Sequence, residues 1–264
     1  LKPFPRFTTV SLYRNNVGNT NYHSLQVRLE KRWDAGLAFR LSYTRSKLID
    51  EASSVFDASI LAGPVANFPV ADGFNRKLER DVSTGDLPNA FAASWTYELP
   101  FGLSHRVNPT GFIGKFASGW QLAGVVTLQS GLPVAVSQAT NFNGFAGYGT
   151  QRPNCIARPE LPGSQRTTAR FFNTDAFQTA PQFTLGSCSR NPLRGPGYRT
   201  IDLALMKRIG LTENLAADFR AEVYNLTNTP PIGNPASVLG AAGFGAIASA
   251  GDPRVIQLAF RLSF

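Results

Sequence analysis

The chain has 264 residues, of which 43% are hydrophobic and only 16% are charged. The hydrophobic fraction argues against a disordered chain, and the charged fraction lies below the roughly 25% that is usual in soluble domains. The net charge of +9 is spread along the sequence, which argues against a nucleic-acid partner and leaves an anionic lipid or glycolipid as an alternative.

Eight segments alternate between apolar and polar residues with the period of two that is typical of β-strands. In chain order they are residues 7–13, 21–32, 36–48, 90–99, 119–130, 198–209, 214–226 and 254–264. Most are longer than ordinary strands of about five or six residues, and they match the roughly 9–11 residues that cross a bilayer. Only Trp33, Asp34 and Ala35 separate the second segment from the third, which predicts a β-hairpin.

The last segment, RVIQLAFRLSF, has one wholly apolar face. That face consists of Ile256, Leu258, Phe260, Leu262 and Phe264. No polar residue follows to cover it, so we expect lipid to lie against it.

The connections alternate in length along the chain. Residues 49–89, 131–197 and 227–253 form long loops, whereas residues 33–35 and 210–213 form tight turns at the other end of the sheet. This asymmetry is typical of outer-membrane barrels, which have short periplasmic turns and long extracellular loops. We therefore predict an all-β fold, an antiparallel up-and-down meander of about eight long strands in one domain (1–264), part of a transmembrane β-barrel, with poorly ordered loops. No transmembrane helix is expected, because the sequence lacks an apolar run of about eighteen residues.

Alternation alone is equally compatible with a soluble β-sandwich or a lipocalin-like barrel, because it does not show which face meets water. Strand length, aromatic residues near strand ends and opposite charges on the polar face favour the membrane barrel. The polar face would line a wet lumen, and the candidates for that position are Arg28, Arg40, Asp202, Arg220 and Glu222.

Three stretches, in this order, resemble the C-terminal part of TonB-dependent outer-membrane transporters of the Oar-like type. They are NTNYHSLQVRLEKRWDAGLAFRLSYTRSKLIDEAS (19–53), FRAEVYNLTNTP (219–230) and PRVIQLAFRLSF (253–264). The resemblance implies a cell outer membrane location, a lumen wall with ligand-facing loops, and a closing strand ending at Phe264 that the barrel-assembly machinery reads. It also implies a plug domain and the TonB system as partners, with an unidentified ligand.

Family members are several times longer and have about 22 strands. We therefore expect the chain to be a fragment of such a transporter. The alternatives are a complete small barrel with a structural or adhesive role and, less favoured, a soluble basic domain that binds polyanions.

The sequence predicts no enzyme, cofactor or metal site. His23 and His105 lack neighbouring ligands, and the GFGAIA stretch (243–248) has neither the strand nor the helix of a nucleotide site, so we expect a flexible loop there. The adjacent Asp50 and Glu51 are expected to be solvated loop charges. Cys155 and Cys188 fall in one long loop, where an oxidising exterior would favour a disulfide over two free thiols.

Overall fold

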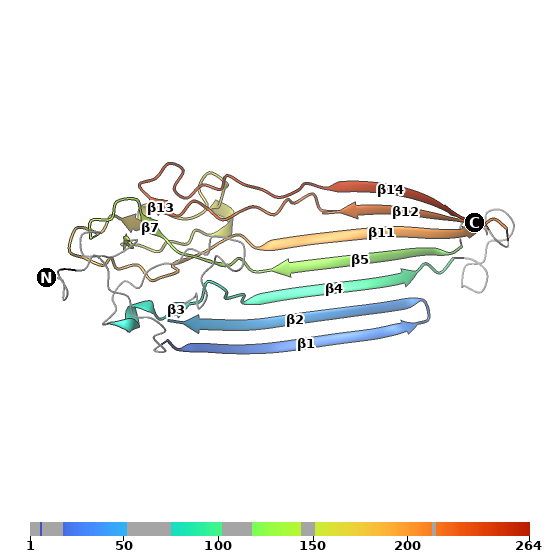
Figure 1. Cartoon of the computed structure of the whole chain (residues 1–264), viewed down its shortest axis with the longest axis horizontal. Helices are drawn as coiled ribbons and strands as arrows, with labels where there is room; N and C mark the ends of the chain where they lie inside the picture. Colours follow the sequence, from blue (N-terminus) through green and yellow to red (C-terminus); the bar gives the residue numbers. More distant parts are fainter. Residues whose placement is uncertain (1–5, 7–17, 52–74, 102–117, 144–150, 213–214) are drawn as a thin grey trace.

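Seven long strands form one antiparallel sheet in the computed structural model, which describes residues 6, 18–51, 75–101, 118–143, 151–212 and 215–264 (Figure 1). The strands follow one another across the sheet in chain order, so the sheet is an up-and-down meander. They are β1 (Thr20–Asp34), β2 (Leu37–Asp50), β4 (Asn89–Glu98), β5 (Trp120–Gln129), β11 (Tyr198–Gly210), β12 (Ala216–Tyr224) and β14 (Val255–Ser263). The short β3 (Asp81–Val82) extends this sheet beside β2.

The predicted fold class is confirmed, and the predicted strands coincide with the observed ones to within a few residues. The expected strand at residues 7–13 lies outside the described residues. The described helices are three short 3-10 turns, η2 (Arg76–Glu79), η4 (Gly163–Gln165) and η5 (Thr174–Ala176). None of the described helices is long and apolar enough to cross a membrane.

The predicted hairpin is present, with its turn at Ala35 and Gly36. Both residues have positive φ, 51° and 76°, as a tight turn between twisted strands requires. This turn lies at one end of the sheet, where β4 and β11 also end and β5 and β12 begin, and we name it the turn end. At the other end, which we name the loop end, β2, β5 and β12 end and β4, β11 and β14 begin (Figure 1).

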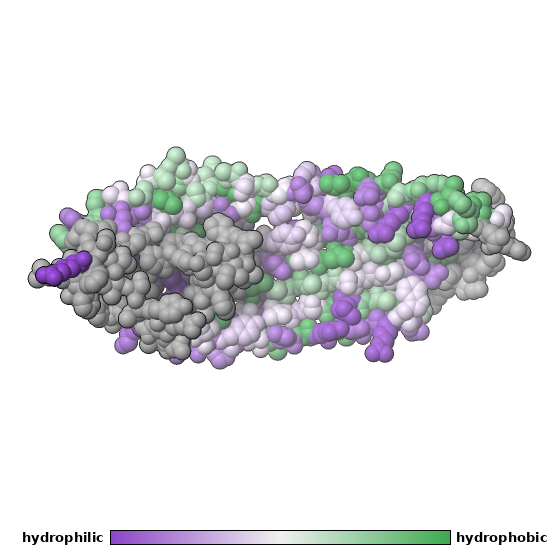
Figure 2. Space-filling view, viewed as in Figure 1, coloured by the Kyte–Doolittle hydropathy of each residue, from purple (hydrophilic) through white to green (hydrophobic). Residues whose placement is uncertain are grey.

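The two faces of the sheet differ in chemistry. On the apolar face, hydrogen-bonded rows run from strand to strand through residues such as Leu37, Tyr97, Leu122, Leu205 and Leu258. The apolar side chains of the edge strands are exposed, with Leu25 at 62% and Leu258 at 70% of full exposure. Figure 2 shows hydrophobic residues (green) gathered at the top of the view, where β12 and β14 lie, with hydrophilic groups between them.

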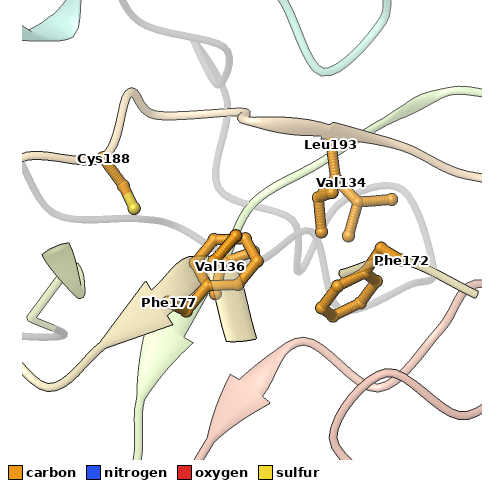
Figure 3. Packing of buried hydrophobic residues seen from close by; sticks show 7 residues of the cluster. Val134, Val136, Phe172, Phe177, Cys188 and Leu193 are labelled. Atoms are coloured by element: carbon orange, nitrogen blue, oxygen red, sulfur yellow. The ribbon is translucent and has the colours of Figure 1, made fainter. Parts of the chain in front are cut away.

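The largest buried apolar cluster of the described residues lies in the loops rather than on the sheet. Figure 3 shows its centre, where Phe172 and Phe177 pack edge to face with ring centroids 5.6 Å apart. Phe244, from another loop, contacts both rings. The members of the cluster are Val134, Val136, Phe172, Ala176, Phe177, Cys188 and Leu193.

The loop residues around this cluster (75–88, 130–143, 151–197 and 225–254) are named the cap. Short strand pairs join its segments: β6 (Pro133–Val134) with β10 (Leu193–Arg194), β7 (Ser137–Gln138) with β13 (Val238–Leu239), and β8 (Asn154–Cys155) with β9 (Phe177–Gln178). The expectation of poorly ordered loops is wrong for these residues, because apolar burial and backbone pairing fix them.

Candidate functional site

The polar face of the sheet is concave and borders an open hollow of about 690 Å³. Residues of both β1 and β12 line it, although four strands separate them in the sheet, so the sheet must curve around the hollow. Its charged lining includes Glu30, Arg40, Asp202, Arg220 and Glu222.

Opposite charges meet across this face. The Glu30 carboxylate accepts a hydrogen bond from Arg28 Nη2 at 2.6 Å, and its other oxygen lies 3.5 Å from Arg40 Nη2. On β12, Arg220 Nη2 lies 2.5 Å from Glu222 Oε1. The side chains of Arg28, Arg40 and Arg220 remain more than half exposed, so they are available to a polar ligand or a packed polypeptide.

The five residues proposed for the lumen therefore lie on one face. Arg40, Asp202, Arg220 and Glu222 line the hollow directly, and Arg28 lies beside it through Glu30. Asp202 has a structural contact as well, because its Oδ1 accepts the backbone N–H of Asn225 at 2.8 Å. Glu30 was not singled out as a site residue, although its position between Arg28 and Arg32 in the alternating pattern was the signal that could have identified it.

Three ion pairs attach the 130–197 loop to the segment around β3. Arg152 Nη2 lies 2.5 Å from Glu79 Oε2 with both side chains buried, and Arg194 Nη2 lies 2.7 Å from the buried Asp86. Arg190 pairs with Asp50, also in a buried position. In each pair the arginine comes from the longer loop and the carboxylate from the end of β2 or the loop after it.

The expectation that Asp50 and Glu51 are solvated is therefore wrong. Asp50 is 4% exposed because it receives the Arg190 guanidinium. The Glu51 side chain is 12% exposed and lies 3.6 Å from Arg76 and 3.7 Å from Arg80. The arginine partners of Asp50 and Glu51 come from the 130–197 loop and from the loop after β2. The sequence immediately around the two carboxylates does not reveal them.

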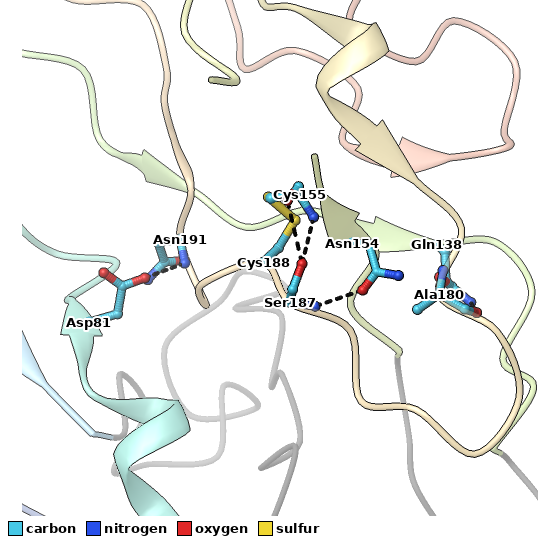
Figure 4. Close-up of a disulfide and its surroundings, with 8 residues drawn as sticks. All are labelled: Asp81, Gln138, Asn154, Cys155, Ala180, Ser187, Cys188 and Asn191. Atoms are coloured by element: carbon cyan, nitrogen blue, oxygen red, sulfur yellow. Dashed lines mark hydrogen bonds between the residues drawn. A yellow bond between two sulfur atoms is a disulfide. The ribbon is translucent and has the colours of Figure 1, made fainter. Parts of the chain in front are cut away.

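A disulfide joins Cys155 and Cys188, whose Cα atoms are 4.8 Å apart (Figure 4). Next to it, Ser187 Oγ accepts the backbone N–H of Cys155 at 3.0 Å, and the Ser187 N–H donates to Asn154 Oδ1 at 2.9 Å. The disulfide thus joins two points of the long loop that are 33 residues apart in the chain, beside the apolar cluster.

The GFGAIA stretch is also fixed in place, contrary to the expected flexible loop. Phe244 packs in the apolar cluster, and the N–H of Phe171 donates to Gly245 O at 2.8 Å. The N–H of Ile247 donates to Thr168 O at 2.7 Å. The stretch therefore holds two loops together.

His105 lies outside the described residues, and the remaining candidates lie on strands. His23 is exposed at the loop end of β1, opposite Lys47, and no cluster of metal-ligating residues occurs among the described residues. The apolar side chains of the closing strand are more than half exposed along its length: Ile256, Leu258, Phe260, Leu262 and Phe264.

A search of curated proteins finds no match to this chain. The family model described as "Outer membrane beta barrel domain" matches residues 1–257, nearly the whole sequence. The curved antiparallel meander, with its uncovered apolar face and charged concave face, has the architecture that this description names. The chain therefore belongs to the outer membrane beta barrel domain family, and its location is the outer membrane.

Proposed function

We propose that the chain forms a segment of the barrel of a TonB-dependent transporter of the Oar-like type, supplying lumen wall and ligand-facing loops without enzymatic activity. The observation that carries the proposal is the charged concave face. Its arginines and carboxylates face a hollow rather than lipid, as the wall of a polar lumen that holds a plug requires.

The direction of the edge strands supports a barrel with more strands than the seven long ones described. Six antiparallel pairings connect β1 to β14, so these two strands run in the same direction. A closed antiparallel barrel therefore needs an odd number of further strands between them. One further strand would close a small barrel filled by its own side chains, whereas many would leave room for a plug.

The proposed partners are an external ligand, a plug, the TonB system and the barrel-assembly machinery. The cap at the loop end would contact the external ligand, and a plug inside the barrel would receive energy from the TonB system. The closing strand, ending at Phe264, would be read by the barrel-assembly machinery. This closing-strand assignment and that of the TonB system rest on the resemblance of 219–230 and 253–264 to the transporter family.

Photo-crosslinking in the full chain tests the proposal. A benzophenone amino acid at Asp202 faces the hollow, whereas the neighbouring Ile201 has the parity of the apolar face and does not line the hollow, so the two positions are matched. We expect Asp202 to crosslink to a plug polypeptide identified by mass spectrometry, and Ile201 to crosslink only to lipid. A functional protein without a polypeptide crosslink at Asp202 would overturn the plugged-transporter proposal.

The second candidate is a small barrel with a structural or adhesive role. The observation that favours it is the cap, which has its own apolar cluster, disulfide and buried ion pairs and so presents a fixed surface. Exposed apolar side chains on that surface, Phe183 at 78% and Ile156 at 62%, suit contact with another macromolecule. Closure with eight strands in total, measured from the mass of a protease-trimmed barrel, would favour this function.

A further inference from the structure

A second hollow, of about 650 Å³, lies on the apolar side at the loop end of the sheet, and we name it the rim groove. One hydrogen-bonded row of the apolar face lies along it, consisting of Tyr43, Phe91, Leu128 and Arg199. The loop after β12 supplies further lining through Thr229, Pro230, Pro231 and Ile232.

The wall of the rim groove is fixed before any ligand arrives. Gly251 N donates to Pro231 O at 2.7 Å, and Ile232 forms a backbone bridge with Ala250. Thr229 N donates to the buried Asn225 at 3.0 Å. A groove whose wall is held in this way loses little conformational freedom when it binds.

The cations at this end of the apolar face form no ion pair within the part of the chain that the structure describes. Arg45, Lys47 and Arg199 are exposed, and none has an ion pair or hydrogen bond through its side chain to another described residue. Arg45 lies opposite Asn89, which lines the rim groove, and Arg199 lines it directly. Cationic groups therefore lie on both sides of an apolar floor.

The distribution of carboxylates on the sheet favours a negatively charged ligand at the loop end of the apolar face. By strand alternation the polar face carries Glu30, Asp50, Glu98, Asp202, Asp218 and Glu222. Of its arginines, Arg28 and Arg40 pair with Glu30, Arg208 with Asp218, and Arg220 with Glu222. Among the described residues of the long strands, Asp34 is the one carboxylate whose register places it on the apolar face, and it lies at the turn end. A ligand at the loop end of the apolar face thus meets positive charge above an apolar surface.

We propose that the rim groove binds one phosphate-bearing glycolipid of the outer leaflet. An acyl chain would lie over Phe91 and Leu128 and continue along the lipid-facing surface, and a headgroup phosphate would lie between Arg45 and Arg199. Guanidinium groups suit this role because they donate paired hydrogen bonds to phosphate oxygens. Tyr43, whose hydroxyl donates to Asn89 Oδ1 at 2.8 Å, lies where an interfacial aromatic side chain is expected.

Native mass spectrometry of the full chain in detergent, titrated with bisphosphorylated lipid A, tests the proposal. We expect saturable binding of one lipid and a loss of affinity of about tenfold in Arg199→Gln, as for removal of one charge-assisted contact. Arg45→Gln should weaken binding in the same direction, and Arg199→Lys should retain more affinity than Arg199→Gln.

The matched control is Arg208→Gln, which removes an exposed arginine from the same strand at its turn end and on the polar face. It should leave the affinity unchanged. Equal binding of dephosphorylated lipid A, or an equal loss in Arg208→Gln, would overturn the site. Equal binding of phosphatidylglycerol with the same dependence on Arg199 would overturn the assignment to a glycolipid.

Discussion

Arg152 and Glu79 are 73 residues apart in the chain, and their side chains meet at 2.5 Å in a buried ion pair. The Arg152 guanidinium also donates to Leu78 O at 3.0 Å, so it binds both a charge and the backbone of η2. This contact is one of the three ion pairs that join the 130–197 loop to the segment around β3.

Replacing Arg152 with Met should destabilise the cap by about 3–5 kcal/mol, because Glu79 would be left buried without its counter-charge. Hydrogen exchange of the cap amides measures the effect. Arg158→Met is the control, since its pair with Glu160 is exposed and should contribute only about 0–1 kcal/mol. Equal effects of the two substitutions would show that the buried pair has no special role.

Removing the disulfide should loosen the cap and leave the sheet intact. In Cys155→Ser/Cys188→Ser, loss of a crosslink spanning 33 residues should cost about 3–4 kcal/mol. Limited proteolysis should then cleave residues 156–187 faster, while the heat-modifiable mobility of the barrel on gels stays the same. Unchanged proteolysis would mean that the apolar cluster alone holds the loop.

Gly124 should tolerate no side chain while Trp95 is present. A Cβ at Gly124 would lie 2.2 Å from Trp95 Cζ2, so Gly124→Ala forces the indole to move and should cost about 1–3 kcal/mol in unfolding from micelles. Gly210→Ala is the control, because nothing lies within 4 Å of its Cβ. Adding Trp95→Phe should recover part of the loss, and a failure to do so would locate the strain elsewhere.

The two faces of β14 should respond differently to charge. Leu258→Arg places a guanidinium on the apolar face and should cost about 2–4 kcal/mol if it lies near the bilayer midplane. Gln257→Arg, one residue away on the polar face opposite Glu222, should cost much less. Urea unfolding of the protein in lipid vesicles compares them, and equal costs would contradict the assignment of the faces.

Deleting Phe264 should reduce insertion into the outer membrane without weakening the folded protein. Its side chain is fully exposed, so its loss removes no packing among the described residues. Outer-membrane fractionation should show accumulation of unassembled protein, whereas Phe183→Ala, at another exposed phenylalanine, should assemble normally. Normal assembly of the deletion variant would remove Phe264 from the proposed recognition by the assembly machinery.

The sheet could be predicted because strand alternation is a local property. Residues 21–32 and 198–209 alternate clearly, and the observed β1 and β11 extend them by only one or two residues. Both faces follow from the same parity, which predicts Arg40 and Glu222 on the polar side, where they line the hollow.

The cap could not be predicted in this way, because its contacts join distant residues. Arg190 and Asp50 are separated by 140 residues, and the two-residue strands β7 and β13 are too short to show a period. We expect poorly ordered loops where strand periodicity is absent, and that expectation is wrong for the cap because a segment without periodicity can still bury apolar side chains. Burial of Phe172, Phe177 and Phe244 supplies the order that repeating hydrogen bonds supply in the sheet.

The three ion pairs have a mechanical consequence. All three arginines belong to one loop, and all three carboxylates belong to the end of β2 or the loop after it. Moving either segment away from the other would therefore leave buried carboxylates without their counter-charges. The third loop is joined to the same body through the β7–β13 pairing and Phe244. We therefore expect a force or a ligand acting on any one loop to be transmitted to the other two, and the cap to exchange its amides and unfold as a single cooperative unit.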